Sequence, residues 1–214
     1  VKLLYGVFYD QDVITRSAIL YNGSEGELRL QRLMSASLDF MTGDYDMIEF
    51  FGHHYLERQT NRHPLTHGIN EIGSFRGASG HFHNPFAILC DRNTDEDHGN
   101  AYGFCLMYSG NFVFEAEVDG YSQTRVAMGI HPKQFEFRLA KGESFEAPEV
   151  VMAYSSKGLS ALSHRYHDIF RENACKSKFV HGDRPILINS WEPFYFHFDS
   201  EKLLQTAKSA KAFG

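Results

Sequence analysis

The stretch RPILINSWEPFYFHFDSEKLLQTAKSAKAFG, residues Arg184–Gly214, decides how the rest of the chain is interpreted. It opens on a short apolar run, Pro185–Asn189, which predicts a buried parallel strand. Ser200 is a good N-cap for a helix that runs toward Gly214 as its stop signal. The apolar residues of this helix repeat with the spacing of a helix that packs on a sheet: Leu203, Leu204, Ala207 and Ala210. The stretch therefore predicts one strand–loop–helix unit.

A parallel strand is not stable without neighbouring strands. We therefore expect this strand–loop–helix unit to be the start of a second domain. In α/β folds, ligands bind at the carboxyl ends of the strands. The segment after the strand holds the only tryptophan, Trp191, with Glu192 beside it. Trp191 is either a wall against a ligand or a core residue. Glu192 can accept hydrogen bonds or orient the loop, but a lone carboxylate is not sufficient for catalysis.

The chain upstream of this unit predicts a β-sandwich. Strand-like runs recur about every ten residues between Gly, Pro and Asp, and Asn22-Gly23 is a strong turn signal. The first convincing helix is Gly158–Cys175, with Leu159, Leu162, Tyr166, Ile169 and Phe170 on one stripe. The domain prediction is a sandwich at 1–155, a linker helix at 156–183 and a strand–helix unit at 184–214. The predicted strands are Lys2–Tyr9, Val13–Tyr21, Leu28–Phe40 with a bulge near Arg32, Asp46–Gly52, Tyr55–Asn61, Ile69–Phe75, Phe86–Cys90, Ala101–Tyr108, Asn111–Val118, Thr124–Ile130, Phe135–Leu139 and Glu149–Ala153.

The composition is that of an ordinary globular protein, with 43% hydrophobic and 22% charged residues. Aromatic residues make up 14% of the chain, which suits the packing of a β-rich core and carbohydrate-binding surfaces alike. The net charge of −6 argues against nucleic-acid binding, which calls for a basic patch.

Three widely spaced cysteines, Cys90, Cys105 and Cys175, are expected to be free thiols of a reducing, cytoplasmic compartment. No apolar run reaches the length of a membrane span, so no membrane partner is expected. The chain begins in a strand pattern and without Met, which is expected of a segment of a longer protein.

The densest polar cluster is the loop Arg76–Pro85. A His-x-His pair on an extended segment, His81 and His83, places both imidazoles on one face and suits a metal of the cupin type if Glu96 and His98 join it. The alternative is a tight loop whose side chains bond to the backbone or to a neighbouring domain. The second pair, His53-His54, points to opposite strand faces and is poor metal geometry.

Several separated blocks resemble one family. PILINSWE (Pro185–Glu192), followed by YF, EKLL and AK, is similar to the first strand, loop and helix of the catalytic barrel in glycoside hydrolase family 36, the microbial α-galactosidases. RGASGHFHNPF (Arg76–Phe86), DHGNAYGFCLMYSGNF (Asp97–Phe112) and QTRVAMGI (Gln123–Ile130) resemble its N-terminal sandwich. The chain departs from the family at Gly80, Phe82, Pro193 and His197, which bears on substrate preference.

The resemblance implies a mainly β fold, an antiparallel β-supersandwich of the galactose-mutarotase type, followed by a linker helix and the first β/α unit of a (β/α)8 barrel. It implies retaining hydrolysis of α-linked galactose in melibiose- or raffinose-type oligosaccharides, without cofactor or metal, in a homotetramer. Trp191 matches the family's substrate-subsite tryptophan. The residues Arg76, His81, His83 and Asn84 are implied at the domain interface and the mouth of the pocket.

The catalytic pair is not expected within this chain. Retaining hydrolysis needs two carboxyl groups about 5–5.5 Å apart. In the family both are aspartates on later barrel strands, beyond Gly214. The chain's turn aspartates Asp44, Asp46, Asp91, Asp95 and Asp97 are explained as turn formers. Two alternatives stay open: a non-catalytic carbohydrate-binding sandwich module and a histidine-rich metal protein of the cupin type.

Overall fold

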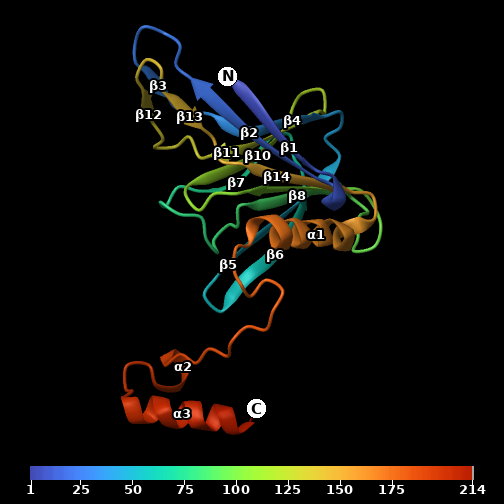
Figure 1. The fold of residues 1–214 in the computed structure, drawn as a ribbon. Helices are drawn as coiled ribbons and strands as arrows, with labels where there is room; N and C mark the ends of the chain where they lie inside the picture. The colour runs from blue at the N-terminus through green and yellow to red at the C-terminus, as the bar shows by residue number, and fades with distance from the viewer. Residues whose placement is uncertain (214) are drawn as a thin grey trace. The chain divides into compact units, whose positions relative to one another are not determined.

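The computed structural model describes residues 1–213, and the chain divides into two compact units, Val1–Ala174 and Cys175–Gly214 (Figure 1). Gly214, predicted as a helix stop, lies outside the described residues. The first unit is built of antiparallel strands, and the second contains two helices. The mainly β, antiparallel prediction is confirmed.

The first unit is a sandwich. One sheet has eight strands in the order β1-β2-β14-β9-β8-β5-β6, with β13 added on β2, and a second has the order β4-β11-β10-β7. A short pair, β12-β3, stands apart. The bounds are β1 Lys2–Phe8, β2 Val13–Tyr21, β3 Leu28–Leu30, β4 Met34–Phe40, β5 Tyr45–His53, β6 Leu56–Pro64, β7 Gly68–Ser74, β8 Phe86–Asp91, β9 Ala101–Leu106, β10 Phe112–Val118, β11 Thr124–Ile130, β12 Phe137–Leu139, β13 Ser144–Glu146 and β14 Val150–Ser155.

The main core lies between the two large sheets. Met47 and Phe104 of the eight-stranded sheet pack with Phe114 and Met128 of the four-stranded one, and all four are buried. The rings of Phe104 and Phe114 lie 5.5 Å apart between centroids. Period-two alternation places these residues on the inner faces, which is why the strand pattern of the sequence is clear.

A second core forms where helix α1, Gly158–Ile169, packs on the eight-stranded sheet (Figure 1). The predicted helical stripe is confirmed, since Leu162, Tyr166 and Ile169 are buried against strand residues such as Ile88. Central strands are therefore covered on both faces. The helix passes into a π-helical turn, η2, at Phe170–Ala174, short of the predicted end at Cys175.

The first turn of α1 is capped by a distant turn of the chain. Its first backbone N–H groups, from Gly158, Leu159 and Ser160, donate to carbonyl oxygens of Gly99, Asp95 and Glu96 at 2.9–3.0 Å. Helix-start N–H groups have no partner within the helix, and here the turn after β8 supplies the acceptors. The turn that holds Asp95 and Asp97, both predicted as turn formers, thus acts as the cap of α1.

In the first unit, one predicted strand is wrong, and one observed strand was not predicted. The run Leu28–Phe40 forms two strands in different sheets, β3 and β4, separated by Gln31–Leu33. Where β4 joins β11, the register shifts at Gly129, and a Cβ there would lie 2.9 Å from the backbone nitrogen of Ser35. The chain therefore passes from one sheet to another near Arg32, where the sequence pattern predicted a bulge within a single strand. Strand β13 was not predicted, because three residues are too few to show alternation.

In the second unit the predicted strand Pro185–Asn189 is not formed; these residues have no ladder partner among the described residues and are exposed. A parallel strand needs neighbours on its edges to satisfy its backbone. The predicted helix is confirmed as α3, Ser200–Phe213, preceded by the short α2, Trp191–Phe194. Its cap is Asp199 rather than Ser200, since Asp199 Oδ1 accepts from the backbone N–H of Lys202 at 2.9 Å.

The cysteines are free, as predicted: Cys90 is buried, Cys105 half-buried and Cys175 exposed. Within residues 1–213 we find no helix with the length and apolar character needed to cross a bilayer.

Two of the three thiols are expected to resist alkylation in the folded chain. Burial raises the pKa of Cys90 to about 11 and that of Cys105 to about 12. The thiolate is the reactive form, so a pKa this far above about pH 8 leaves almost none of it, whereas an unfolded thiol titrates near about 8.5. Iodoacetamide should add one group, on Cys175, to the folded chain and modify all three cysteines in denaturant. Mass spectrometry counts the adducts, and an adduct on Cys90 or Cys105 without denaturant would contradict this account.

Candidate functional site

The polar loop Arg76–Pro85 is held in place by the connection between β9 and β10. Ser79 N–H donates to Ser109 O at 2.9 Å, and Gly77 N–H donates to Asn111 Oδ1 at 2.6 Å. The guanidinium of Arg76 lies over the ring of Phe82, 4.1 Å from its centroid. Backbone ties fix the base of the loop, and the cation–π contact covers one face of Phe82.

Glu49 of β5 lies beneath this loop and was not singled out by the sequence. The residue is 8% exposed, and its Oε1 accepts from Asn61 Nδ2 at 2.8 Å. Oε2 lies 3.4 Å from His83 Nδ1. A buried carboxylate is costly unless it is paired, and the imidazole of His83 is the group that the structure places beside Oε2. The signal was present in the sequence as one acidic residue between Ile48 and Phe50 in a strand.

Three buried polar atoms of this cluster make no hydrogen bond of good geometry within the described chain: Glu49 Oε2, His83 Nδ1 and Asn84 Oδ1. Asn84 is held through its backbone, since its N–H donates to Phe50 O at 2.9 Å. Buried polar atoms are normally satisfied in native proteins. Their gathering at one place indicates that this loop is built for polar contacts.

His81 lies on the outer side of the loop, near Glu57 in the β5–β6 hairpin. Hydrogen bonds from the backbone N–H groups of Glu57 itself and of Tyr55, together with the positive charge of His81 and His54, lower the pKa of the Glu57 carboxyl. The Glu57 side chain is 40% exposed. The hairpin and the loop thus share a cluster of opposite charges.

Of the four residues predicted at the pocket mouth, Asn84 lines a cavity of about 640 Å³ between α1 and strands β5, β6 and β8, whose walls include Ile48, Phe86 and Tyr166. That volume is in the range of small-molecule sites. Arg76 lies over the ring of Phe82, and His83 lies beside Glu49 of β5.

The His-x-His pair does not have the geometry expected for a metal. His81 lies in a turn rather than on an extended segment, and His98 pairs with Asp95, with Nδ1 3.2 Å from Oδ1. Across residues 1–213 no three His, Cys, Asp or Glu side chains converge as metal ligands would.

In the second unit, Trp191 begins α2 and the residue is 44% exposed. The backbone N–H of Trp191 donates to Asn189 Oδ1 at 2.9 Å. The ring centroids of Tyr195 and Phe196 lie 5.2 and 5.3 Å from that of Trp191, so three partly exposed aromatic rings gather on one short segment. Such a cluster offers apolar faces with polar edges, which suits the C–H face of a sugar ring.

The other features beside Trp191 are those of a stiff loop. Glu192 is exposed in the first turn of α2, and Pro193 follows in that turn, where no backbone donor is required. His197 is tied through its carbonyl oxygen, which accepts from Lys202 Nζ at 2.9 Å. The sequence placed Trp191 and Glu192 together, and the structure adds Tyr195 and Phe196 to them.

Two family models match the chain: "Glycosyl hydrolase family 36 N-terminal domain" over residues 1–140 and "Melibiase" over residues 144–214. Among curated relatives, the bifunctional alpha-galactosidase/sucrose kinase AgaSK of Mediterraneibacter gnavus is 46% identical over 100% of this chain and 23% of its own. Alpha-galactosidase AgaA of Geobacillus stearothermophilus is 45% identical over 100% of this chain and 29% of its own. The chain thus spans less than a third of the length of these relatives.

Solved structures similar to this chain are also those of α-galactosidases. The galactosidase domain of AgaSK aligns with a TM-score of 0.96 at 46% identity, covering 99% of this chain and 30% of that one. A variant of Geobacillus stearothermophilus AgaA in complex with stachyose aligns with a TM-score of 0.95 at 44% identity, and another in complex with raffinose with 0.96 at 44%. Both cover 99% of this chain and 30% of that one.

Proposed function

Because its sequence matches the family over most of its length, the chain belongs to glycoside hydrolase family 36, and we propose that its full-length parent is a retaining α-galactosidase. The parent would release terminal α-linked galactose from oligosaccharides of the melibiose and raffinose type. The observation that carries the proposal is the 44–46% identity, over nearly the whole chain, to α-galactosidases, one of which, AgaA, has variants seen in complex with stachyose and with raffinose.

We assign Trp191 to one wall of the substrate pocket, with Glu192 as a neighbouring acceptor for sugar hydroxyls. The exposed ring and its two aromatic neighbours support this assignment. The nucleophile and the acid/base carboxyls would come from later strands of a (β/α)8 barrel that begins near residue 184. Their spacing would be about 5–5.5 Å, as retention requires.

The loop carrying Arg76, His81, His83 and Asn84 is proposed to face the domain interface at the pocket mouth. Its fixed base and its unsatisfied buried polar atoms favour a role in contacts over a role as a free surface loop. Residues 1–155 would form the sandwich domain, residues 156–183 the linker helix and its exit, and residues 184–214 the first barrel unit. A homotetramer in the cytoplasm is the assembly and location we propose.

The full-length parent should hydrolyse p-nitrophenyl α-galactoside and melibiose and leave lactose intact. Measurement across about pH 4–8 covers the range in which a carboxyl acid/base pair operates. Absence of hydrolysis throughout that range would overturn the proposal and favour the non-catalytic carbohydrate-binding module. Analytical ultracentrifugation of the same protein tests the tetramer separately.

Removing the aromatic wall should weaken substrate binding in the parent. Trp191→Ala is expected to raise KM for melibiose about tenfold with a smaller change in kcat, because a stacking wall contributes to ground-state and transition-state binding alike. Trp191→Phe should recover part of the loss. Tyr121→Ala, an exposed aromatic residue in the β10–β11 turn of the first unit, is the control. Equal KM values for Trp191→Ala and the control would remove Trp191 from the substrate site.

A further inference from the structure

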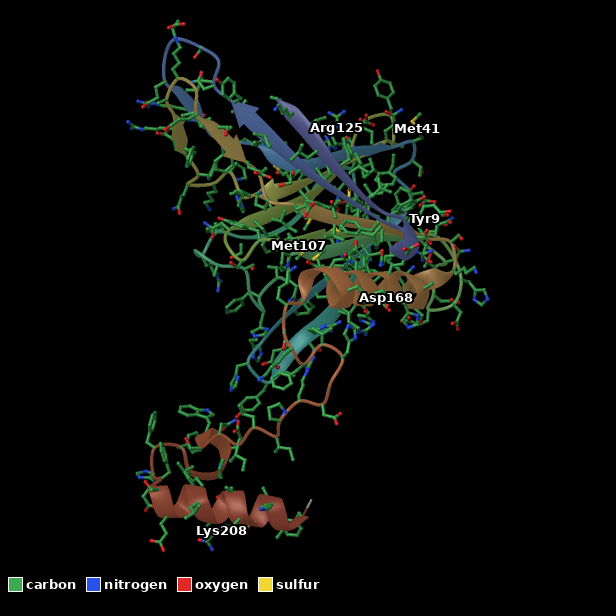
Figure 2. The ribbon with its side chains drawn as sticks, viewed as in Figure 1. Tyr9, Met41, Met107, Arg125, Asp168 and Lys208 are labelled. Atoms are coloured by element: carbon green, nitrogen blue, oxygen red, sulfur yellow. The ribbon has the colours of Figure 1, made fainter. Side chains whose placement is uncertain are left out.

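A second, smaller cavity of about 390 Å³ lies where β1 turns into β2, entirely within the first unit. Its walls come from five elements: the end of β1, the 3-10 turn η1 (Tyr9–Gln11), the start of β2, β14 and α1. The lining includes Phe8, Tyr9, Asp12, Tyr154 and Arg165. Figure 2 marks Tyr9 at the end of β1 and Asp168 on α1, the helix that contributes Arg165.

Two tyrosine rings border this cavity and remain in contact with solvent. Tyr9 is 87% exposed and Tyr154 is 46% exposed. The ring of Tyr154 is held in place, since its hydroxyl donates to Asn100 Oδ1 at 2.7 Å and its ring lies 5.0 Å from that of Tyr102. A fixed ring with an open face can bind an apolar surface at little cost in side-chain entropy.

The polar wall of the cavity is an ion pair. Arg165 Nη2 lies 3.1 Å from Asp12 Oδ2, and Arg165 Nη1 also reaches Ala161 O at 3.4 Å. Asp12 sits in the left-handed region, with φ of 53°, which an aspartate tolerates better than most residues and which turns its carboxylate toward α1. The bond uses Oδ2, so Oδ1 of this largely exposed side chain can accept from a ligand.

The two opposite charges on this wall disfavour the binding of a charged ligand. An anion drawn to Arg165 meets the carboxylate of Asp12, and a cation drawn to Asp12 meets the guanidinium of Arg165. A neutral molecule with several hydroxyl groups fits both, because a hydroxyl donates to a carboxylate and accepts from a guanidinium. The tyrosine faces require that the same molecule also present an apolar surface.

We propose that this cavity binds one pyranose unit of an oligosaccharide, with the C–H face of the sugar on Tyr9 and Tyr154 and its vicinal hydroxyls on Asp12 and Arg165. The site lies wholly within Val1–Ala174, so it needs no residue of the second unit. The inference does not depend on hydrolysis by the parent. An open cavity of this size with two charge-assisted partners should bind in the millimolar range, a free energy of about −4 kcal/mol.

The experiment is a titration of the 214-residue chain with raffinose, followed by amide chemical shifts. Saturable shifts are expected for residues 9–14 and for Tyr154 at about 1–10 mM ligand. Tyr9→Ala should raise the Kd at least about fivefold, and Asp12→Asn, which keeps the left-handed turn, should raise it about threefold. Tyr121→Ala is the matched control: its side chain is 88% exposed, as open as Tyr9, but lies in another turn, and it should leave the Kd unchanged.

Three outcomes would overturn the proposal. One is the absence of shifts at about 20 mM raffinose. Another is a set of shifts confined to residues around Trp191 and unaffected by Tyr9→Ala. The third is shifts at residues 9–14 that depend on protein concentration without sugar, which would assign the surface to a second copy of the chain. A parent that fails to hydrolyse α-galactosides would overturn the proposed function and leave this result standing.

Discussion

Replacing Asn22 by aspartate is expected to lower the free energy of unfolding of the chain by about 3 kcal/mol. Asn22 is 0% exposed and uses all of its side-chain bonding capacity. Nδ2 donates to Gly26 O at 2.8 Å and to Leu139 O at 2.9 Å, while Oδ1 accepts from Ser24 N and Ser24 Oγ. A carboxylate has no donor, so the change would turn two bonds into contacts between an anion and carbonyl oxygens.

Urea unfolding of the two proteins measures this loss as a lower midpoint at unchanged slope. The difference should shrink in acid, because a protonated carboxyl regains one donor. Asn93→Asp, the same change at an exposed position, is the control and should shift stability by less than about 0.5 kcal/mol. A midpoint for Asn22→Asp equal to that of the control would mean that the network around Asn22 does not contribute to stability.

At Asn22 the sequence predicts the turn but not the pairing of the strands that the turn connects. The pair Asn22-Gly23 is a turn signal, and a turn is present. The strands on either side do not pair with each other, however: β2 pairs with β1, β13 and β14, whereas β3 pairs with β12. The residue that anchors the turn, Leu139, lies 117 positions away in the chain. Local propensity predicts the turn, and only the tertiary fold decides which strands it joins.

The strands were predictable where alternation and turn residues agree. Val13–Tyr21 and Thr124–Ile130 were predicted at the bounds observed for β2 and β11, because both alternate and both are flanked by turn residues. Pro185–Asn189 has an equally clear apolar pattern but forms no strand here. A parallel strand is stabilised by its neighbours, so a pattern cannot determine whether they are present.

Some residues of the candidate site can be predicted from the sequence, whereas contacts between distant segments cannot. Trp191 stands out in the sequence as the only tryptophan, beside an acidic residue, so its segment can be predicted by inspection. The pair of Glu49 and His83 cannot, because β5 and the loop meet only after β8 adds to the sheet beside β5. The ion pair of Asp12 with Arg165 joins the first turn to α1 over 153 positions, beyond the reach of any local pattern.

Gly158→Ala is expected to cost about 4 kcal/mol of stability, because two penalties coincide at the start of α1. Gly158 has φ of +75°, a conformation that disfavours a side chain. A Cβ there would also lie 2.5 Å from Glu96 O and 2.6 Å from His98 N, both backbone atoms that cannot move alone. The turn would have to separate from the helix, and the bonds from Leu159 N to Asp95 O and from Ser160 N to Glu96 O would break.

The cost of the positive φ can be measured apart from the cost of the backbone clash. Another glycine of the chain has a positive φ but no atom near an added Cβ. Gly68 has φ of +93° and no atom within 4 Å of an added Cβ, so Gly68→Ala should cost only about 1–2 kcal/mol. The difference between the two losses in free energy of unfolding then measures how much the cap stabilises α1. Hydrogen exchange should show lost protection at Leu159 and Ser160 in that variant and normal protection in Gly68→Ala. If both variants lost the same stability, the turn would not be the element that holds α1 against the sheet.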